Sequence, residues 1–586
     1  MLCRDKWYLI IFFLLVNLSL SGCADGNGGE APTANHPPLA VAGSDQTVSL
    51  ASVVKLNGTQ SYDPDWDSLT YKWVIAAKPS GSSADLSLSN SPTPILITDK
   101  DGDYLVQLTV NDGLCNSRPV SIKITAKSAK GILDTSFGND SNPTDGVLDG
   151  FVAHDNAAGG FGSDMGHSMV LDSKGRIYVA GNSRSSAGSN SYDMVIWRFT
   201  DRGSLDTTFG NGKGFVRHNG AAGGISYDEG RSIALDKDGR LYVAGYGSNP
   251  NNYQDMAIWR YTSDGIIDTT FGGDVNPADG IPDGFVVHNY GGGNYPSTGA
   301  NAIYLDPAGR IYVTGYITEQ AGGNMSMVIW RYTANGSVDS SFGGGSGHVI
   351  HKSSSDWRIS SGNSLIVDQD GLIYVTGTYY HYTLHDTYMF IWRYTSDGTL
   401  DTAFGGGSGF VAYCGAAGSS YFDKANSIIL DQSGRIYVAG YSWNAEGGYG
   451  NLDMVVWRYN SNSGLDTDFG GGDGLVVHNN AAGGILKNDV GLSLALDPAG
   501  RVYVSGYSYS TSGDYEMVVW RYTSNGVLDT SFGEGKGFVV HDSTAAGNPP
   551  GSSGDAIALD KEGRVMVAGY SKNLSGNYDM TIWRYE

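Results

Sequence analysis

At positions 435–441 the chain reads Arg435-Ile436-Tyr437-Val438-Ala439-Gly440-Tyr441. Near-copies of this stretch recur along the chain and begin at Arg176, Arg240, Arg310, Leu372, Arg501 and Arg564. Each copy is followed by a second apolar run that contains a tryptophan, at Trp197, Trp259, Trp330, Trp392, Trp457, Trp520 and Trp583. Self-similarity at a spacing of about 60 to 70 residues predicts a repeat architecture.

Each repeat predicts four short strands. Strand A is an apolar run that ends in an Asp-x-x-Gly turn, strand B is the quoted stretch, and strand C is the tryptophan run. Strand D is a short run such as residues 537–541, which ends in histidine. Short β-branched and aromatic runs bounded by Gly, Asp, Asn and Ser are typical of strands. Strands B and C are apolar on both faces, so the sheet must be covered on both sides, as in blades packed around an axis.

The order of the strands predicts how the ring closes. The last repeat reaches Glu586 directly after strand C, whereas a lone strand D at residues 150–154 precedes the first strand A. Pairing these two strands would complete a seventh blade, and a solenoid has no use for such an offset. We therefore predict an all-β chain whose larger domain, residues 131–586, is a seven-bladed β-propeller closed by its N-terminal outer strand.

Composition and motifs bound the function. The chain has 586 residues, too many for one domain, and a formal net charge of −23. This charge argues against nucleic acid or an anionic membrane surface as a partner. The sequence contains no His-Glu-x-x-His, no phosphate-cradling loop and no nucleophile elbow. We therefore expect a non-catalytic protein.

The first residues are typical of a secretory signal. Arg4 and Lys6 precede an apolar run at residues 7–16 that is too short to span a bilayer. The following Leu20-Ser21-Gly22-Cys23 resembles the bacterial lipobox. That resemblance implies a signal peptide at 1–22 and acyl chains on Cys23 that anchor the protein to a membrane. With Ala24 next, it implies the outer membrane or cell surface of a Gram-negative bacterium. Residues 23–36 are expected to form a flexible tether.

Cysteine usage adds little. With Cys3 in the signal and Cys23 acylated, Cys115 and Cys414 remain in different domains, which excludes a disulfide framework.

Residues 37–127 differ in character from the rest. Short alternating strands over about ninety residues predict an Ig-like β-sandwich. Phrases such as residues 56–65 and 104–113 resemble the PKD family, a spacer or adhesion module of bacterial surface proteins, although Val74-Ile75-Ala76 stands where the family often has Gly-Asp-Gly. From Gly131 to Glu586 the repeated Leu-Asp-Thr-Ser-Phe-Gly and Trp-Arg-Tyr phrases resemble the bacterial delta-60 repeat family, whose biochemical role is largely unassigned.

One set of candidate binding residues stands four positions before each strand A. An oxygen-bearing side chain recurs there, at Asp164, Asp228, Thr298, Ser360, Asp423, Asp489 and Ser552. If strand A lies nearest the axis, the four carboxylates ring the channel mouth, where they could hold calcium. Side chains of these types also cap local turns, and this second interpretation is favoured.

A second set is two acidic C–D loops. Alternate oxygen side chains followed by glycine and a later acid follow the logic of a calcium loop, at Asp140, Asn142, Asp145 and Asp149 and at Asp274, Asn276, Asp279 and Asp283. The spacing is one residue longer than in an EF-hand and the twelfth-position glutamate is missing. A plain hydrogen-bonded turn is the favoured interpretation.

Two further recurring sets indicate structure. The histidines that end strand D lie on the outermost strand, where one per blade cannot converge on a metal. The seven strand-C arginines recur with seven aspartates of the Leu-Asp-Thr phrases, which predicts a bidentate pair that stabilises each blade.

Aromatic residues break the repeat in the B–C loops of the fourth and fifth blades, at Tyr379, Tyr380, His381, Tyr382, Trp443 and Tyr449. Exposed rings suit stacking on sugars or anchoring a protein partner, and packing on neighbouring loops is the alternative. We therefore expect a monomeric, non-catalytic cell-surface lipoprotein whose propeller binds carbohydrate or protein. The alternative is a secreted polysaccharide hydrolase or lyase acting at the channel mouth, for which we find no irregular cluster of His, Asp, Glu or Tyr near strand A.

Overall fold

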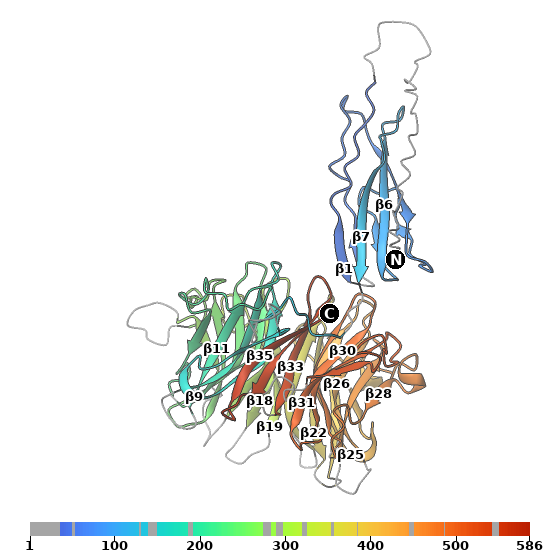
Figure 1. Cartoon of the computed structure of the whole chain (residues 1–586). Coiled ribbons are helices and arrows are strands. Elements are labelled where there is room, and N and C mark those ends of the chain that lie inside the picture. The colour runs from blue at the N-terminus through green and yellow to red at the C-terminus, as the bar shows by residue number, and fades with distance from the viewer. Residues whose placement is uncertain are drawn as a thin grey trace, which may run out of the picture. The chain divides into compact units, whose positions relative to one another are not determined.

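The computed structural model describes residues 35–49, 53–127, 131–138, 149–185, 191–224, 226–273, 283–288, 297–318, 325–352, 357–381, 383, 385–444, 451–485, 487–541 and 550–586. The chain divides into two compact units, one of Met1–Thr47 and Val53–Ala126 and one of Val48–Ser52 and Lys127–Glu586 (Figure 1). The prediction of an all-β chain is confirmed, because the described residues contain strands and three short 3-10 turns but no α-helix. Within those residues, no helix has the length and apolar character needed to cross a membrane.

The smaller unit is a two-sheet sandwich. One sheet has the order β1(Gln46–Ser49), β7(Val120–Lys127), β6(Gly102–Asn111) and β3(Thr70–Ala77). The other has the order β2(Val53–Lys55), β5(Ile95–Ile97) and β4(Leu86–Ser87). Trp73 of β3, Leu96 of β5 and Leu108 of β6 are fully buried, so both sheets contribute to the core. The sequence predicts no disulfide framework; Cys115 is nevertheless disulfide-bonded, whereas Cys414 is a free cysteine.

In the residues that the structure describes, the strands of the larger unit form seven sets of four antiparallel strands, two of which are joined by a bridge. The first three comprise β12(Phe215–His218), β11(Tyr192–Phe199), β10(Ile177–Ser185) and β9(Gly159–Leu171); β13(Asp228–Leu235), β14(Leu241–Ser248), β15(Gln254–Tyr261) and β16(Phe285–His288); and β17(Thr298–Leu305), β18(Ile311–Thr318), β19(Met325–Tyr332) and β20(His348–His351).

The fourth and fifth sheets comprise β21(Trp357–Val367), β22(Ile373–His381), β23(Asp386–Tyr394) and β24(Phe410–Tyr413); and β25(Gly418–Leu430), β26(Ile436–Asn444), β27(Asn451–Tyr459) and β28(Leu475–His478). A single parallel bridge between Thr387 and Phe422 joins them. The last two comprise β29(Asp489–Leu496), β30(Val502–Tyr509), β31(Tyr515–Tyr522) and β32(Phe538–Val540); and β33(Ser552–Leu559), β34(Val565–Lys572), β35(Tyr578–Tyr585) and β8(Phe151–His154). The 3-10 turns η1(Gly343–Gly345), η2(Gly405–Gly407) and η3(Gly470–Gly472) precede strands D.

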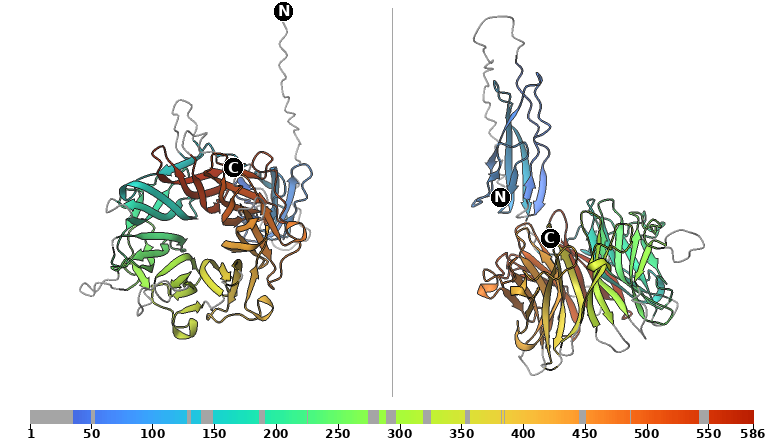
Figure 2. Two further views of the ribbon diagram at one scale, coloured as in Figure 1. Left: turned by 90° about the horizontal axis from the view of Figure 1, so that it is seen from below. Right: turned by 180° about the vertical axis from the view of Figure 1, so that it is seen from behind.

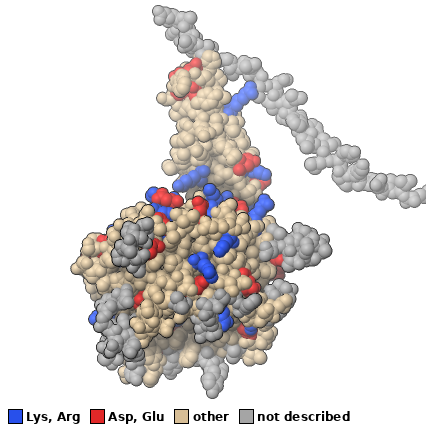
Figure 3. All heavy atoms as spheres, turned by 90° about the vertical axis from the view of Figure 1, so that its left-hand side faces the viewer, with Lys and Arg blue, Asp and Glu red and all other residues tan. Residues whose placement is uncertain are grey.

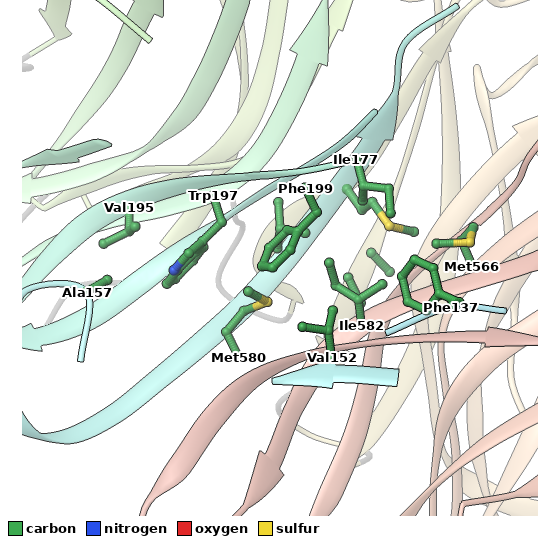
Figure 4. Packing of buried hydrophobic residues seen from close by; sticks show 14 residues of the cluster. Phe137, Val152, Ala157, Ile177, Val195, Trp197, Phe199, Met566, Met580 and Ile582 are labelled. Atoms are coloured by element: carbon green, nitrogen blue, oxygen red, sulfur yellow. The ribbon is translucent and has the colours of Figure 1, made fainter. Parts of the chain in front are cut away.

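The seven sheets surround one axis (Figure 2). Each strand A contacts strand A of the next sheet, and β33 of the last sheet contacts β9 of the first. β8 pairs with β35 from Met580↔His154 to Trp583↔Phe151, so a strand that precedes the first sheet completes the last one. Between these two sheets, Trp197 and Ile177 pack with Met580, Ile582 and Val152 in one buried cluster (Figure 4).

Arginines tie each sheet to its neighbour. The Nε of every strand-C arginine lies 2.7 or 2.8 Å from a carboxylate of a Leu-Asp phrase, in the pairs Arg198–Asp206, Arg260–Asp268, Arg331–Asp339, Arg393–Asp401, Arg458–Asp466, Arg521–Asp529 and Arg584–Asp134. The expected bidentate geometry is wrong, because other guanidinium nitrogens serve other acceptors. Arg458, for example, donates to the Ser524 carbonyl of the next sheet, and Arg584 donates to the Asp201 carbonyl of the first sheet.

Candidate functional site in the central channel

Every strand A carries a β-bulge at the same step. In each sheet the register with strand B slips by one residue there, which leaves one extra residue, at His167, Arg231, Asn301, Asn363, Asn426, Leu492 and Asp555. A bulge re-aims the side chain of its extra residue. Because the strands A form the innermost ring (Figure 2), these seven residues lie on the inner edges of the sheets, around the central axis.

The glycine of the repeated strand-B stretch makes room for the bulge. A Cβ on Gly440 would lie 1.8 Å from the carbonyl oxygen of Lys424, and a Cβ on Gly245 would lie 1.8 Å from that of Glu229. The same close approach recurs at Gly181, Gly315, Gly377, Gly506 and Gly569. A glycine inside a strand often marks such an approach of two backbones. The stretch that dominates the sequence therefore also positions the channel side chains.

Three of the bulge residues join neighbouring strands. The Nδ2 atoms of Asn301, Asn363 and Asn426 donate to the backbone carbonyls of Gly362, Ala425 and Gly491 on the next strand A, at 3.0, 2.7 and 2.8 Å. These amides satisfy carbonyls on the inner edges of the sheets, which have no further strand to pair with. They have a structural role on this side of the channel.

On the other side, three ionisable bulge residues and Glu229, two positions before Arg231, gather in what we call the channel cluster: His167, Glu229, Arg231 and Asp555. His167 lies between two carboxylates, with Nε2 3.4 Å from Glu229 Oε1 and Nδ1 3.3 Å from Asp555 Oδ2. Arg231 Nε forms an ion pair with Glu229. These residues come from the last sheet and the first two sheets, so the cluster forms only when the ring closes.

Tyrosines surround Glu229. The hydroxyl of Tyr227 donates to Glu229 Oε2, and the hydroxyl of Tyr246 donates to the same oxygen at 3.0 Å. The two rings are stacked, with centroids 5.8 Å apart and planes 6° from parallel. The side chain of Glu229 is only 2% exposed. It is therefore a fixed carboxylate at the centre of a hydrogen-bonded network.

The charges of the cluster compensate one another. Burial alone would raise the pKa of Glu229, but the charges of His167 and Arg231 and the tyrosine hydroxyls outweigh it and lower that pKa. Burial alone would lower the pKa of Arg231, but Glu229 outweighs it and raises that pKa. Glu229 and Arg231 are thus charged at neutral pH.

The opposite end of the channel is chemically different. A cavity of ≈ 520 Å³ is lined there by the apolar ends of strands A from the last sheet and the first three, including Met169, Ile233 and Ile303. The propeller therefore has one polar end, where strands A begin, and one apolar end, where they meet the Asp-x-x-Gly turns.

No metal site is evident in the described ranges, which contain no group of three or more His, Cys, Asp or Glu placed to hold an ion. In the channel cluster, Glu229 and Asp555 lie against different nitrogens of His167, so their donors do not converge on one point as metal ligands must.

The aspartates proposed for the channel mouth lie elsewhere. Asp164, Asp228, Asp423 and Asp489 are fully buried under the D–A connections. They accept hydrogen bonds from the backbone N–H groups of Asn156, Gly220, Ala416 and Ala481, respectively. Thr298 and Ser552 occupy equivalent buried positions, and the side chain of Ser360 lies outside the described residues. The aspartate side chains accept hydrogen bonds from the backbone of the D–A connections and so fix the loops, as the turn-capping interpretation predicts.

Their burial predicts a pH effect. Burial raises the pKa of Asp228 to about 7, so the folded chain keeps a proton that the unfolded chain loses near pH 4. We expect the stability of the wild type relative to Asp228→Asn to fall between pH 4 and pH 7, by at most about 1.4 kcal/mol per pH unit. Urea unfolding of both proteins across this range measures the difference. Parallel stability curves would contradict the prediction.

The strand-D histidines pack between sheets. His154, His218 and His288 lie against the tryptophans of the following sheet, and burial lowers the pKa of each to about 4. They are neutral at pH 7 and do not face the channel.

Both proposed calcium loops fall largely outside the described residues. Asp140, Asn142, Asp145, Asp274, Asn276 and Asp279 are not described, and only Asp149 and Asp283 are. If these loops are plain turns, as favoured above, the melting temperature is expected to differ by less than about 1 °C between calcium and EDTA, since only a ligand of the native state stabilises it. A rise of several degrees in calcium that Asp149→Asn and Asp283→Asn abolish would contradict this.

The aromatic candidates divide into two groups. Tyr379 is buried, with its ring 4.7 Å from that of Phe390. Tyr380 is partly buried, its hydroxyl lies 2.8 Å from His385 Nδ1, and His381 beside it is partly buried as well. Trp443 is 39% exposed at the end of β26. Tyr382 and Tyr449 lie outside the described residues. Trp443 is therefore the accessible ring of this set.

The expectation that no irregular cluster of His, Asp, Glu or Tyr lies near strand A is wrong. The channel cluster is such a set, and its bulge residues His167, Arg231 and Asp555 stand three positions after Asp164, Asp228 and Ser552 of the first candidate set. Its signal was present in the sequence: this strand-A position holds seven residues of five types, while the apolar positions after it repeat.

Family comparisons match both units. A family model for a PKD domain matches residues 42–125. The model described as a "Domain of unknown function (DUF5122) beta-propeller" matches residues 175–209, 237–271, 307–342, 369–404, 432–469 and 498–532, and a "Beta-propeller repeat" model matches 410–447. The DUF5122 segments run from the turn before strand B to the Phe after strand C. They leave out every strand A, and with it every channel residue.

Individual relatives resemble parts of the chain. The mouse Dyslexia-associated protein KIAA0319 homolog is 32% identical over 97 residues, which are 16% of this chain and 9% of that protein, so the chain spans only a small part of it. The solution structure of the PKD domain from KIAA 1837 protein is 25% identical and covers 18% of this chain and 93% of that one, with a TM-score of 0.14.

Larger structures are more remote. A polysaccharide lyase of family PL25, an ulvan lyase, is 12% identical and covers 72% of this chain and 94% of its own, with a TM-score of 0.37. A Bacteroides thetaiotaomicron protein of unknown function is 12% identical and covers 94% and 99%, with a TM-score of 0.31. Likenesses at these values say nothing about activity. The chain thus carries an N-terminal PKD domain followed by β-propeller repeats of the DUF5122 family.

Proposed function

We propose that this chain is a non-catalytic cell-surface lipoprotein whose propeller binds carbohydrate at the polar end of its central channel. The observation that carries the proposal is the channel cluster. Strands B and C repeat the same residues in every sheet, whereas the channel position of strand A changes chemistry around the ring. Ligand sites commonly consist of a few convergent polar groups in a hollow.

Aromatic residues near the same end support a carbohydrate. Trp443 is exposed at the end of strand B, and strands B end where strands A begin because the two are antiparallel. Tyr227 and Tyr246 already use their hydroxyls on Glu229; Tyr246 is buried, and the partly exposed Tyr227 is stacked on it beside Glu229. A flat ring with a polar edge suits the faces and hydroxyls of a sugar.

The proposed location rests on Cys23, which lies outside the described residues. Acyl chains on this residue would anchor the protein, and the PKD domain would separate the anchor from the propeller along the chain. In a Gram-negative host, the wild type is expected to partition into the detergent phase of a membrane extract and the Cys23→Ala variant into the aqueous phase. Aqueous partition of both proteins would contradict the anchor.

Calorimetric titration with a panel of oligosaccharides tests the binding. We expect Glu229→Gln to weaken binding of any sugar that the wild type binds by about tenfold, since it removes the charge that holds Arg231 and His167 in place. Trp443→Ala should also weaken it. Trp66→Ala is the matched control, because Trp66 is an exposed tryptophan of the smaller unit. Failure of every sugar to bind would overturn the proposal.

A hydrolase or lyase is the second candidate, and the channel cluster is the observation that favours it. Against catalysis, both nitrogens of His167 face carboxylates and Glu229 is 2% exposed, so neither is an open base. The binding proposal predicts that no new reducing ends and no unsaturated products appear when polysaccharides are incubated with the protein. Their appearance, with loss in His167→Ala, would support the enzyme instead.

A further inference from the structure

One cation in the channel has no anion beside it among the described residues. Lys424 lies on β25 of the fifth sheet, two positions before the bulge residue Asn426. The equivalent position of the second sheet holds Glu229, and the other sheets have uncharged residues there, namely Met165, Gly299, Ser361, Val490 and Ser553. Of the seven residues at this position, Lys424 is the one cation, and it lies on the side of the ring away from the channel cluster.

The contacts of Lys424 are sparse. Its ammonium lies 5.9 Å from the centre of the Tyr441 ring, and in the part of the chain that the structure describes it has neither a carboxylate nor a hydrogen-bond acceptor as a partner. Its side chain is only partly exposed. An enclosed charge without a partner is costly, so a protein that retains one normally supplies the counter-charge from elsewhere.

A second cation faces the same space. Arg231 projects from the second sheet, and its side chain is 40% exposed although it is paired with Glu229. The pKa of Lys424 is lowered, first by burial and then by the charge of Arg231. Both residues lie on strands A, which form the innermost ring, so the two cations face the same central space.

The remaining charges of the channel cluster do not supply the missing anion. Glu229 is paired with Arg231 and His167, and Asp555 contacts His167 and accepts a hydrogen bond from Ser553 Oγ at 2.6 Å. The outer face shown in Figure 3 differs, since acidic and basic side chains are scattered there among neutral ones. The net charge of −23 repels anions, but physiological salt largely screens the repulsion from charges more than about 8 Å away, so the two nearby cations dominate the local field.

We infer that Lys424 and Arg231 together bind an anionic group of the ligand inside the channel, and that the ligand is an acidic carbohydrate bearing carboxylate or sulfate groups. This inference rests on the proposed function and narrows it. An anion between the two cations would give Lys424 the partner it lacks and would use the exposed part of Arg231 without breaking its pair with Glu229. Tyr441, beside Lys424, would offer a ring to the same sugar.

The test uses oligosaccharides of equal length: a neutral one, a uronate, the methyl ester of that uronate, and a sulfated one. We expect the wild type to bind the uronate or the sulfated sugar at least about tenfold more tightly than the neutral and esterified sugars. Binding of one acidic sugar and not the other identifies the anion. Lys424→Met should remove this preference and leave the affinity for the neutral sugar unchanged, and Lys424→Arg should retain it.

Lys561→Met is the matched control, because Lys561 has a 69% exposed side chain outside the channel and should leave all affinities unchanged. Thermal unfolding checks that Lys424→Met folds, and loss of an unpaired charge should leave its melting temperature equal or higher. Equal affinity for neutral and acidic sugars, or a preference that survives Lys424→Met, overturns this inference while the proposed function stands. No binding of any sugar overturns both.

Discussion

Replacing Arg584 with alanine is expected to lower the free energy of unfolding of the propeller by about 3 kcal/mol, because it removes the nearer of the two arginines that pair with a buried carboxylate and leaves only Arg564, at 3.4 Å. Arg584 Nε lies 2.7 Å from Asp134 Oδ2, and both side chains are 3% exposed. One further nitrogen donates to the Asp201 carbonyl of the first sheet at 2.5 Å, and the guanidinium lies 4.5 Å from the centre of the Phe137 ring. This arginine therefore holds the last sheet, the N-terminal segment and the first sheet together.

Chemical denaturation measures the loss, and hydrogen exchange locates it. Protection from hydrogen exchange in Arg584→Ala should fall first at β8, because β8 pairs with β35, the strand that carries Arg584. Arg310→Ala is the matched control: its Nε is 2.6 Å from Asp306, but its side chain is 40% exposed, so this pair should contribute about 1 kcal/mol or less. Equal losses of unfolding free energy in the two variants would contradict the role assigned to Arg584 in joining the last sheet to the first.

The order of the strands and the composition of each sheet could be predicted from the sequence, because the same strand patterns recur in seven repeats. Apolar residues on both faces of strands B and C required covered sheets, and the offset of strand D pointed to the partner of β35. The arginine–aspartate pairs were foreseen for the same reason. The hydrogen bonds from these arginines to the next sheet could not be predicted. Their acceptors are backbone carbonyls, such as those of Ser524 and Asp201, which belong to a different repeat and which no side-chain pattern marks.

The channel site was missed for a physical reason. Asp164 and Asp228 are residue types that suggest ligands, but their side chains accept hydrogen bonds from backbone N–H groups of the D–A connections. His167 and Arg231 reach the channel through a one-residue slip in backbone register, and no residue type specifies such a slip by itself. The sequence feature most closely linked to this slip in register is the strand-B glycine. A glycine inside a strand, however, also occurs where a small residue is needed in a crowded sheet, so it does not by itself predict a bulge.

Replacing Gly440 with alanine is expected to destabilise the propeller by about 3 kcal/mol, at the upper end of the range for overpacked sites. The cause is steric overlap of the new Cβ with a neighbouring strand, not a backbone conformation that only glycine can adopt. Its Cβ would lie 1.8 Å from the Lys424 carbonyl oxygen and 2.9 Å from the carbonyl carbon, and a paired backbone cannot yield as a flexible side chain does. The strand carrying Lys424 and Asn426 must shift instead. The variant should therefore lose both stability, measured by urea unfolding, and the preference for acidic sugars.

The neighbouring Gly464 separates these effects from the general consequences of replacing a glycine. It lies in the same sheet's C–D connection, and the nearest atom to a Cβ there is 3.8 Å away. Gly464→Ala should be neutral or slightly stabilising, because alanine restricts the unfolded chain more than glycine does. If Gly440→Ala behaved like Gly464→Ala, the bulge would not depend on the glycine. The link from the repeated stretch to the channel residues would then fail, even if the propeller itself were unchanged.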